Sequence, residues 1–410
     1  MNVFASLAPT TRRRLLDLFV AGLLFWSSLT CLLPTLSLYV DDIGATRQEV
    51  GIVIGAFAVG LLALRPWLGQ LADQRGRRLV LLIGLAVVAI APLGYMLTTS
   101  IPVLIAVRAF HGLSIAAFTT AYSALVVDLS PPDQRGELIG YMSMVNPIGL
   151  AVGPAIGGFL QTAAGYTPLF LTSAGLGLIG LIFAMRVKPD NRPLEAQPTQ
   201  PKQSFWKLLG SPRLRTPTLV MLLVGIAFGA LITYAPLFLK ESGANLNPGL
   251  FYTAAAIASF VARLPTGRAS DRHGRGRFIT LGLVLYMTAM LVLWTANTAE
   301  SFLLAAVLEG AGSGIFIPMT LTLVADRTQA LERGRVFGLC MSGLDLGIAT
   351  AGPAMGFFAE QVGYRGMFGL AGGLVFLALM SFVSQNSKDL PHSLQFALGH
   401  GRDVYAQASK

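Results

Sequence analysis

The stretch GQLADQRGRR, residues 69–78, follows the apolar run GIVIGAFAVGLLALRPWL and holds one Asp and three Arg side chains in ten residues. The chain around it is poor in charge. Charged residues make up 12% of it, about half of the roughly 25% usual for soluble domains, and apolar residues make up 54%. A water-soluble surface cannot be built from this composition. We therefore interpret residues 69–78 as a loop at the edge of a membrane, directly after a transmembrane helix.

The rest of the chain repeats this pattern of apolar runs and charged breaks. Cut at those breaks, it gives twelve runs of about 18 to 26 residues, each long enough to cross a hydrocarbon core of roughly 30 Å as a helix. We expect transmembrane helices at 15–40, 48–68, 79–98, 102–126, 138–160, 168–185, 216–239, 249–266, 278–296, 302–325, 336–358 and 367–384. The first run is too long for a signal peptide and no small-residue cleavage site follows it, so we expect it to be retained. The predicted fold class is an all-α integral membrane protein.

The net charge of +10 would suggest a nucleic-acid partner in a soluble protein. If the N-terminus is cytoplasmic, however, roughly 24 of the 30 Lys and Arg lie in the N-terminal segment, the inward loops and the tail. Only Arg47, Lys240 and Arg365 then fall in outward loops. This bias argues against nucleic-acid binding and predicts an inner-membrane protein with both termini in the cytoplasm.

The two cysteines, Cys31 and Cys340, lie in apolar runs in opposite halves of the chain. They offer neither a disulfide framework nor a metal cluster, so we expect no metal site and interpret both as packing residues. No phosphate-binding loop or hydrolase motif is present either, and we expect no enzyme and no cofactor.

The chain also repeats itself. A shift of 198 positions superimposes special residues of the two halves: Gly69 and Gly267, Asp73 and Asp271, Gly76 and Gly274, Arg77 and Arg275, and Asp128 and Asp326. After residue 340 the shift becomes 199 and aligns GPAIG, 153–157, with GPAMG, 352–356. Because six helices separate equivalent positions, both halves have the same orientation in the membrane, and the repeat is parallel.

This repeat sets the expected domains. Residues 1–185 form an N-terminal six-helix bundle and residues 216–384 a C-terminal one. Between them, 186–215 is rich in Pro and basic residues and lacks an apolar period, which indicates a cytoplasmic linker. Residues 385–410 form a cytoplasmic tail, too short for a folded domain, that resembles a disordered or surface-lying segment.

The opening stretch, with its glycines and charges, resembles the signature loop of the major facilitator superfamily. The residues that carry the resemblance are Gly69, Asp73, Gly76, Arg77 and Arg78, with a weaker copy at Asp271 and Arg275. The resemblance covers essentially the whole chain and implies two parallel six-helix bundles. It also implies that Arg77 pairs with Asp128, at the cytoplasmic end of the fourth helix, as a latch that stabilises the outward-facing state. The alternative is a loop that only sets topology.

The predicted fifth helix contains Gly149, Gly153, Pro154, Gly157 and Gly158. This pattern resembles the antiporter motif of drug/proton antiporters within the same superfamily. Small residues four apart allow close helix packing, and proline bends a helix, so the resemblance implies a pivot for rocking motions. The alternative is plain packing by small residues.

Charged residues inside the predicted helices indicate proton coupling. Placing an arginine in a bilayer costs at least about 2.5 kcal/mol on insertion scales, so Arg108 is expected to have a function. Arg108 and the nearby His111 resemble part of the fourth-helix motif that the family links to proton coupling. Glu309 and Asp345 are the deep carboxylates, and the 198 shift maps Glu309 onto His111. We expect Glu309 to carry the proton, with Asp345 as the alternative carrier. The structural alternative for Glu309 is a permanent ion pair with Arg108.

In this fold helices one, four, seven and ten line a central cavity, and helix one here lacks the deep acid of many drug antiporters. Aromatic side chains are the remaining candidates for its lining, and each could instead be lipid-facing or core. They are Trp26, Phe110, Phe118, Phe228, Tyr234 and Phe316.

Together these features predict a secondary active transporter, a proton-coupled exporter of hydrophobic or amphipathic small molecules that works by alternating access. Its partners would be the substrate, protons and the lipid bilayer, its energy source the proton gradient, and its oligomeric state a monomer. The alternatives are a proton symporter that imports a nutrient and a receptor or lipid-handling protein that does not pump.

Overall fold

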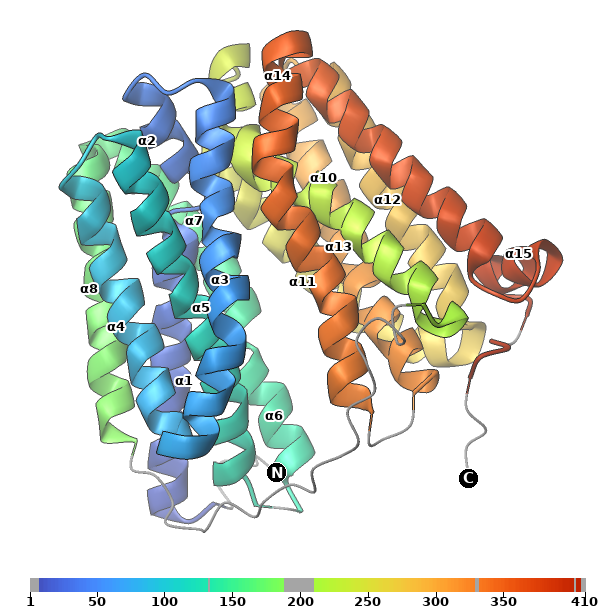
Figure 1. Ribbon diagram of the computed structural model, residues 1–410, viewed down its shortest axis with the longest axis horizontal. Coiled ribbons are helices and arrows are strands. Elements are labelled where there is room, and N and C mark those ends of the chain that lie inside the picture. Colours follow the sequence, from blue (N-terminus) through green and yellow to red (C-terminus); the bar gives the residue numbers. More distant parts are fainter. Residues whose placement is uncertain (1–6, 132, 188–209, 329–331, 402, 407–410) are drawn as a thin grey trace. The chain divides into compact units, whose positions relative to one another are not determined.

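The computed structural model describes residues 7–131, 133–187, 210–328, 332–401 and 403–406 (Figure 1). The regular elements in these ranges are α-helices. They are α1 (Pro9–Cys31), α2 (Leu36–Asp42), α3 (Arg47–Arg75), α4 (Arg77–Met96), α5 (Ile101–Leu129), α6 (Arg135–Ser143), α7 (Val145–Ala164), α8 (Tyr166–Arg186), α10 (Pro212–Ser242), α11 (Pro248–His273), α12 (Arg275–Thr295), α13 (Ala299–Asp326), α14 (Arg333–Gln385) and α15 (Leu390–Leu398). Residues 188–209, most of the predicted linker, lie outside the described ranges.

Ten segments of the described chain are long and apolar enough to cross a membrane. Helix α11 is not among them, because Arg263 and its Ser, Thr and Tyr residues dilute its apolar run. Helix α14 has 53 residues, roughly 80 Å of helix, and is interrupted by the non-helical residue Gly363, so it can cross twice. With α11 and both arms of α14, the chain has the twelve crossings of the predicted all-helical fold.

The expectation that residues 69–78 form a loop is wrong. Helix α3 continues to Arg75 and α4 begins at Arg77, so only Gly76 leaves the helical conformation. Its φ of 95° lies in the region that L side chains rarely adopt, which lets the chain turn between two helices within a single residue. Gly274 repeats this turn between α11 and α12 with a φ of 84°.

Two of the predicted helices are interrupted. The first, expected at 15–40, divides into α1 and α2, because Pro34 has no N–H to continue the helical hydrogen bonding. The fifth, expected at 138–160, is divided into α6 and α7 at Met144.

The sequence repeat is also a repeat of backbone conformation. Positive φ values occur at Gly44 and Gly243, at Gly76 and Gly274, and at Gly165 and Gly363, each pair separated by 198 or 199 positions. Among the described residues, Gly399 alone has a positive φ without such a partner. It ends α15, which lies in the tail.

The contacts divide the chain into two compact units. The N-terminal unit comprises Met1–Ala45, Ile52–Thr199 and Asn247–Thr253, and the C-terminal unit comprises Thr46–Gly51, Gln200–Leu246 and Ala254–Lys410.

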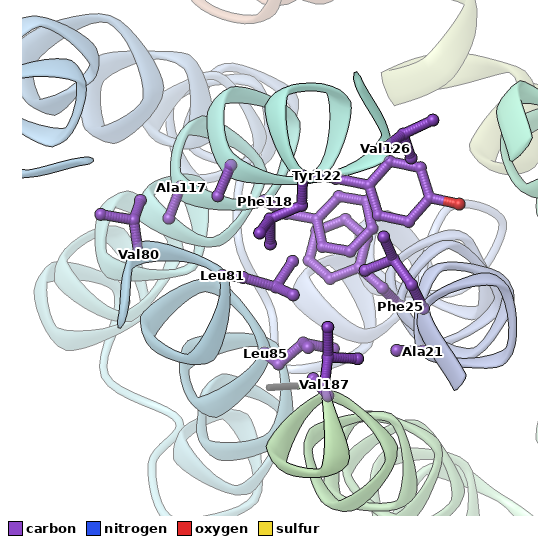
Figure 2. Packing of buried hydrophobic residues seen from close by; sticks show 14 of the residues in the cluster. Ala21, Phe25, Val80, Leu81, Leu85, Ala117, Phe118, Tyr122, Val126 and Val187 are labelled. Atoms are coloured by element: carbon purple, nitrogen blue, oxygen red, sulfur yellow. The ribbon is translucent and has the colours of Figure 1, made fainter. Parts of the chain in front are cut away.

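Within the N-terminal unit, α1 packs against α7 and α8, and α4 packs against α5 and α8. Phe25 stacks on Phe118 with ring centroids 3.8 Å apart, and Tyr122 continues the stack (Figure 2). Ser28 and Ser173 join α1 to α8 by donating reciprocally to each other's carbonyl oxygens, at 2.7 and 2.9 Å. Small polar residues of this kind hold apolar helices together without a hydrophobic driving force.

Within the C-terminal unit, α10 packs along α14 and α12 along α13. The close approach depends on glycine: a Cβ on Gly229 of α10 would lie 2.6 Å from the Ala351 side chain of α14. Part of the tail that we expected to be disordered or surface-lying forms helix α15, which packs on α12 and α14. Asp389 caps α15 by accepting from the His392 N–H at 2.9 Å, a contact that holds the pKa of Asp389 below its usual range.

Candidate functional site

The predicted latch residues of the first half meet where α4 begins and α5 ends. Arg77 forms an ion pair with Asp128 through Nη1 and also donates to the carbonyl oxygen of Ala124 at 3.1 Å. Arg78 donates to the carbonyl oxygen of Met185 at the end of α8, at 2.6 Å. The expected pair between Arg77 and Asp128 is thus present, and it ties together helices of one unit.

The second half repeats this arrangement with one addition. Arg275 pairs with Asp326 at 3.2 Å, the counterpart of the first pair, and also with Asp271 at 2.6 Å. It donates to the Ser270 hydroxyl as well, at 2.6 Å. Arg275 therefore makes two ion pairs among the described residues, where Arg77 makes one.

The ion pairs of both halves are partly exposed to solvent. The side chains of Arg77 and Asp128 are 23% and 40% exposed. Ion pairs in such surroundings contribute up to about 1 kcal/mol, so a pair of this kind can break and re-form during a conformational cycle. At Gly69 a Cβ would meet no atom within 4 Å, so the glycine requirement of the motif lies in the turn at Gly76.

Three glycines of the fifth-helix motif, Gly149, Gly153 and Gly157, form the seam between α7 and α1. A Cβ would lie 2.4 Å from the Trp26 Cβ at Gly149, 2.0 Å from the Thr30 hydroxyl at Gly153, and 1.8 Å from the Cys31 carbonyl oxygen at Gly157. Pro154 and Gly158 of the motif are also buried. Thr30 closes the seam by donating to the carbonyl oxygen of Gly149 at 2.8 Å. Any movement of α7 against α1 therefore takes place at backbone contact distance.

A cluster of buried polar side chains lies between α3, α4 and α5. The Tyr95 hydroxyl is 3.0 Å from His111 Nδ1, and Arg108 Nη1 is 3.5 Å from the same nitrogen. The guanidinium lies 4.5 Å from the centroid of the Phe57 ring. Arg108 is 7% exposed and His111 is fully buried, yet Arg108 Nε and His111 Nε2 have no hydrogen-bond partner among the described residues.

In the C-terminal unit, α13 carries a buried carboxyl group. Glu309 is 3% exposed, and its Oε1 has no hydrogen-bond partner among the described residues. The fully buried Tyr286 of α12, whose hydroxyl is likewise without a partner in the described chain, lies close enough to interact with Glu309 electrostatically. Ser313 is one turn further along α13, 9% exposed. A carboxyl group held this way can take up a proton without disturbing an existing ion pair.

The other sequence candidates are distributed between the interior and the surface. Asp345, the alternative proton carrier, is half-buried on α14. The structure packs Phe118, Tyr234 and Phe316 inside their bundles at 0–1% exposure, where the core interpretation applies. Trp26, Phe228 and Phe110 are the predicted cavity aromatics with accessible surface, and Phe110 is 42% exposed.

Sequence reasoning missed several polar residues. Tyr95 and Tyr286 lie in apolar runs and read as ordinary helix residues. Arg327 and Asp403 form a buried ion pair with a nitrogen–oxygen distance of 2.7 Å, although Arg327 looked like one more charge of an inward loop. Its position directly after Asp326, at the end of a repeat helix, was the available signal.

Comparison with known proteins agrees with this architecture. The sequence profile described as Major Facilitator Superfamily matches residues 18–261 and 245–398. The staphylopine export protein of Staphylococcus aureus is 27% identical over 381 residues, covering 90% of this chain and 96% of that protein. The multidrug resistance protein MdtG of Escherichia coli is 25% identical over 401 residues, covering 93% and 96%.

Solved structures share the fold. A single-residue mutant of the nucleoside transporter NupG superposes with a TM-score of 0.78 at 13% identity, covering 90% of this chain and 98% of that one. A bacterial homologue of the human lysosomal transporter Spinster, inward-facing and unoccupied, gives a TM-score of 0.72 at 14% identity, covering 92% and 98%.

Proposed function

Because the chain belongs to the Major Facilitator Superfamily, and is therefore a transport protein of the membrane, we propose that it is a proton-coupled exporter of hydrophobic or amphipathic small molecules, oriented with both termini in the cytoplasm. The observation that carries the proposal is Glu309, a carboxyl group 3% exposed inside a membrane-spanning helix. An ionisable side chain at such a place marks a substrate or proton pathway by default. Export is supported by relatives whose names describe staphylopine export and multidrug resistance.

The proposed cycle uses the features described above. Glu309 takes up a proton while water is excluded from its carboxyl group, because desolvation disfavours the charged form. It releases the proton when water reaches the carboxyl group. Helix α7 moves against α1 along the seam of glycines, and the pairs made by Arg77 and Arg275 hold one end state until they break. The proton gradient supplies the driving force, and the substrate leaves in exchange.

The test is transport into proteoliposomes under an imposed pH gradient, with a panel of lipophilic dyes and drugs. Glu309→Gln keeps the shape of the side chain but cannot exchange a proton, so gradient-driven movement should fall to the level of empty liposomes while substrate exchange without a gradient continues. The matched control is Glu300→Gln, which alters an exposed glutamate in the first turn of the same helix. Gradient-driven transport that is unchanged in Glu309→Gln contradicts the proposed role.

A second cargo class is favoured by Arg108. This guanidinium is buried and forms no ion pair with the described residues of its own unit, so it could receive an acidic group of a substrate. The panel therefore includes organic acids and their methyl esters. A preference for the acids that disappears in Arg108→Gln would identify an exporter of acid-bearing metabolites, whereas equal transport of acids and esters would favour neutral amphipathic cargo.

A further inference from the structure

Helix α15 is attached to the C-terminal unit by one face. Ser393, Phe396 and Ala397 are buried on that face, at 0–4% exposure. The Thr280 hydroxyl of α12 donates to the carbonyl oxygen of Ala397 at 3.0 Å, and a Cβ on Gly276 would lie 2.1 Å from the carbonyl oxygen of Phe396. The tail helix is thus seated on the first two turns of α12.

A buried arginine holds the end of the tail in place. Arg327, at 0% exposure, makes a two-pronged contact with Asp403 at 2.7 and 2.9 Å. It also donates to the carbonyl oxygens of Arg213 and Asn386, each at 3.0 Å, and its guanidinium lies 5.2 Å from the Tyr405 ring. Because bidentate pairs fix both position and orientation, the segment on either side of α15 is anchored.

The next face of α15 is apolar and exposed. Leu390, Leu394 and Leu398 are 55%, 39% and 57% exposed. At about 100° per residue, positions four apart fall on one stripe, which borders the buried face. His392 and Gln395 occupy the remaining side and are exposed. The helix therefore has one side for protein, one apolar side and one polar side, as a helix lying in a membrane surface requires.

The chain length confines α15 to the membrane edge. The membrane-spanning helix α14 ends at Gln385, and four residues, 386–389, separate it from α15. Four residues reach at most about 14 Å. The partner helix α12 begins at Arg275, so its contacts with α15 also lie within its first turns. Helix α15 therefore lies at the level where α14 ends and α12 begins, which is the edge of the membrane.

The charges around α15 complement an anionic surface. Lys388, Arg272 and Arg277 are exposed near its two ends, and a Cβ on Gly399 would lie 3.1 Å from the Arg277 Cβ. The nearby acid, Asp389, is engaged by His392 at 2.6 Å. Basic side chains beside an amphipathic helix attract anionic lipid head groups.

We propose that α15 is an interfacial helix that binds anionic phospholipid at the membrane edge where α12 begins and α14 ends. Leu390, Leu394 and Leu398 enter the boundary between head groups and acyl chains, and Lys388 and Arg277 contact lipid phosphates. The ion pair of Arg327 with Asp403 keeps the helix in this position.

The test places an environment-sensitive fluorophore at Leu394→Cys, with Gln395→Cys as the matched control one residue away. Both native cysteines are buried and are replaced by Ala in the background. In nanodiscs the probe at 394 should emit at shorter wavelength and be quenched several-fold more by a shallow nitroxide lipid than the probe at 395. Aqueous iodide should show the reverse order. Equal iodide quenching at both positions would overturn the proposal.

The lipid class is tested in nanodiscs of phosphatidylcholine with and without phosphatidylglycerol. The anionic lipid should shift the 394 emission further, and Lys388→Gln with Arg277→Gln should remove that increment while leaving the shift in pure phosphatidylcholine. An emission that ignores the anionic lipid would overturn the phosphate contacts. A shift that follows protein concentration instead of lipid would assign the leucine stripe to a second copy of the chain and overturn the membrane assignment.

Discussion

Among single residues, Arg327 shows how a cation is accommodated in an apolar chain. Its guanidinium is fully buried and is satisfied by Asp403, by two backbone carbonyls and by neighbouring rings. Glu309 is the opposite case, since one of its oxygens is buried without a partner among the described residues. The first arrangement is suited to holding a structure together, and the second to changing its charge.

Removing the carboxylate of Asp403 should destabilise the C-terminal unit. Asp403→Ala leaves Arg327 buried and uncompensated, which costs about 3 kcal/mol for comparable broken pairs. The midpoint of thermal unfolding in detergent should fall by several degrees. Asp133→Ala, which removes an exposed acid between α5 and α6, is the control and should leave the midpoint unchanged. Equal midpoints for both variants would show that the pair contributes nothing to stability.

Breaking the Arg77 pair should alter conformation more than stability. We expect Asp128→Asn to increase labelling of a Thr120→Cys reporter on α5 by an impermeant thiol reagent added from the cytoplasmic side, because the outward-facing state loses its latch. The unfolding midpoint should change little, since the pair is partly exposed. Asp133→Asn serves as the control, and unchanged labelling in Asp128→Asn would count against a latch.

The sequence predicted the partners of some of these residues and not of others. The partnership of Arg77 with Asp128 was implied by the resemblance of residues 69–78 to a known family motif, and the structure contains the ion pair. Arg327 and Asp403 are 76 positions apart and belong to no shared period, so only the folded tail could bring them together. The core positions of Phe118 and Phe316 were also undetermined, because an aromatic in a helix that is apolar all round has no marked face.

At the scale of elements, the seam of α1 and α7 is the closest helix contact that the predicted motifs produce. The sequence showed why glycines four apart could approach another helix, but not which helix they would meet. Thr30 and Ser28 of α1 are engaged in packing with α7 and α8. The break at Pro34 and the single-residue turn at Gly76 depend on local backbone geometry that a run of hydropathy does not resolve.

Adding one methyl group to this seam should separate the helices. In Gly157→Ala the new Cβ would lie 1.8 Å from the Cys31 carbonyl oxygen, so the backbones must move apart. We expect a loss of about 1–3 kcal/mol in unfolding free energy. Gly175→Ala in α8, where a Cβ meets no atom within 4 Å, should instead be neutral or stabilising. Thermal unfolding of both variants measures the difference, and equal behaviour would refute close packing at Gly157.

At the scale of the whole molecule, the duplicated architecture was predictable because more than one independent feature of the sequence indicates it. The shift of 198 positions and the alternation of apolar runs with charged breaks both describe the same repeat, and the paired positive-φ glycines of the structure follow it. Helix ends were harder, since α3 and α11 continue past their apolar runs into the signature motif. The tail was the largest surprise, because helix α15 packs on α12 and α14 where we expected no fixed contacts.

An even number of crossings places both termini on the same side of the membrane, and the distribution of basic residues predicts the cytoplasmic side. Single cysteines test this in intact cells with an impermeant maleimide. Thr99→Cys, between α4 and α5, should react from outside, whereas Asp133→Cys and Lys388→Cys should react only after permeabilisation. The opposite pattern would invert the topology, and labelling of all three from outside would contradict the count of crossings.

The buried pair between Arg327 and Asp403 can form only late in the synthesis of the chain. The carboxylate is encoded 76 residues after the guanidinium, an interval that a ribosome covers in roughly 4–15 s at about 5–20 residues per second. Once residue 385 has been added, every membrane-spanning helix has been synthesised, yet Arg327 at the end of α13 still lacks its counter-charge. The pair can form only after Asp403 has been added. A chain terminated between residues 385 and 403 would contain all its crossings and still leave Arg327 without its carboxylate, a difference that proteases of the membrane could detect.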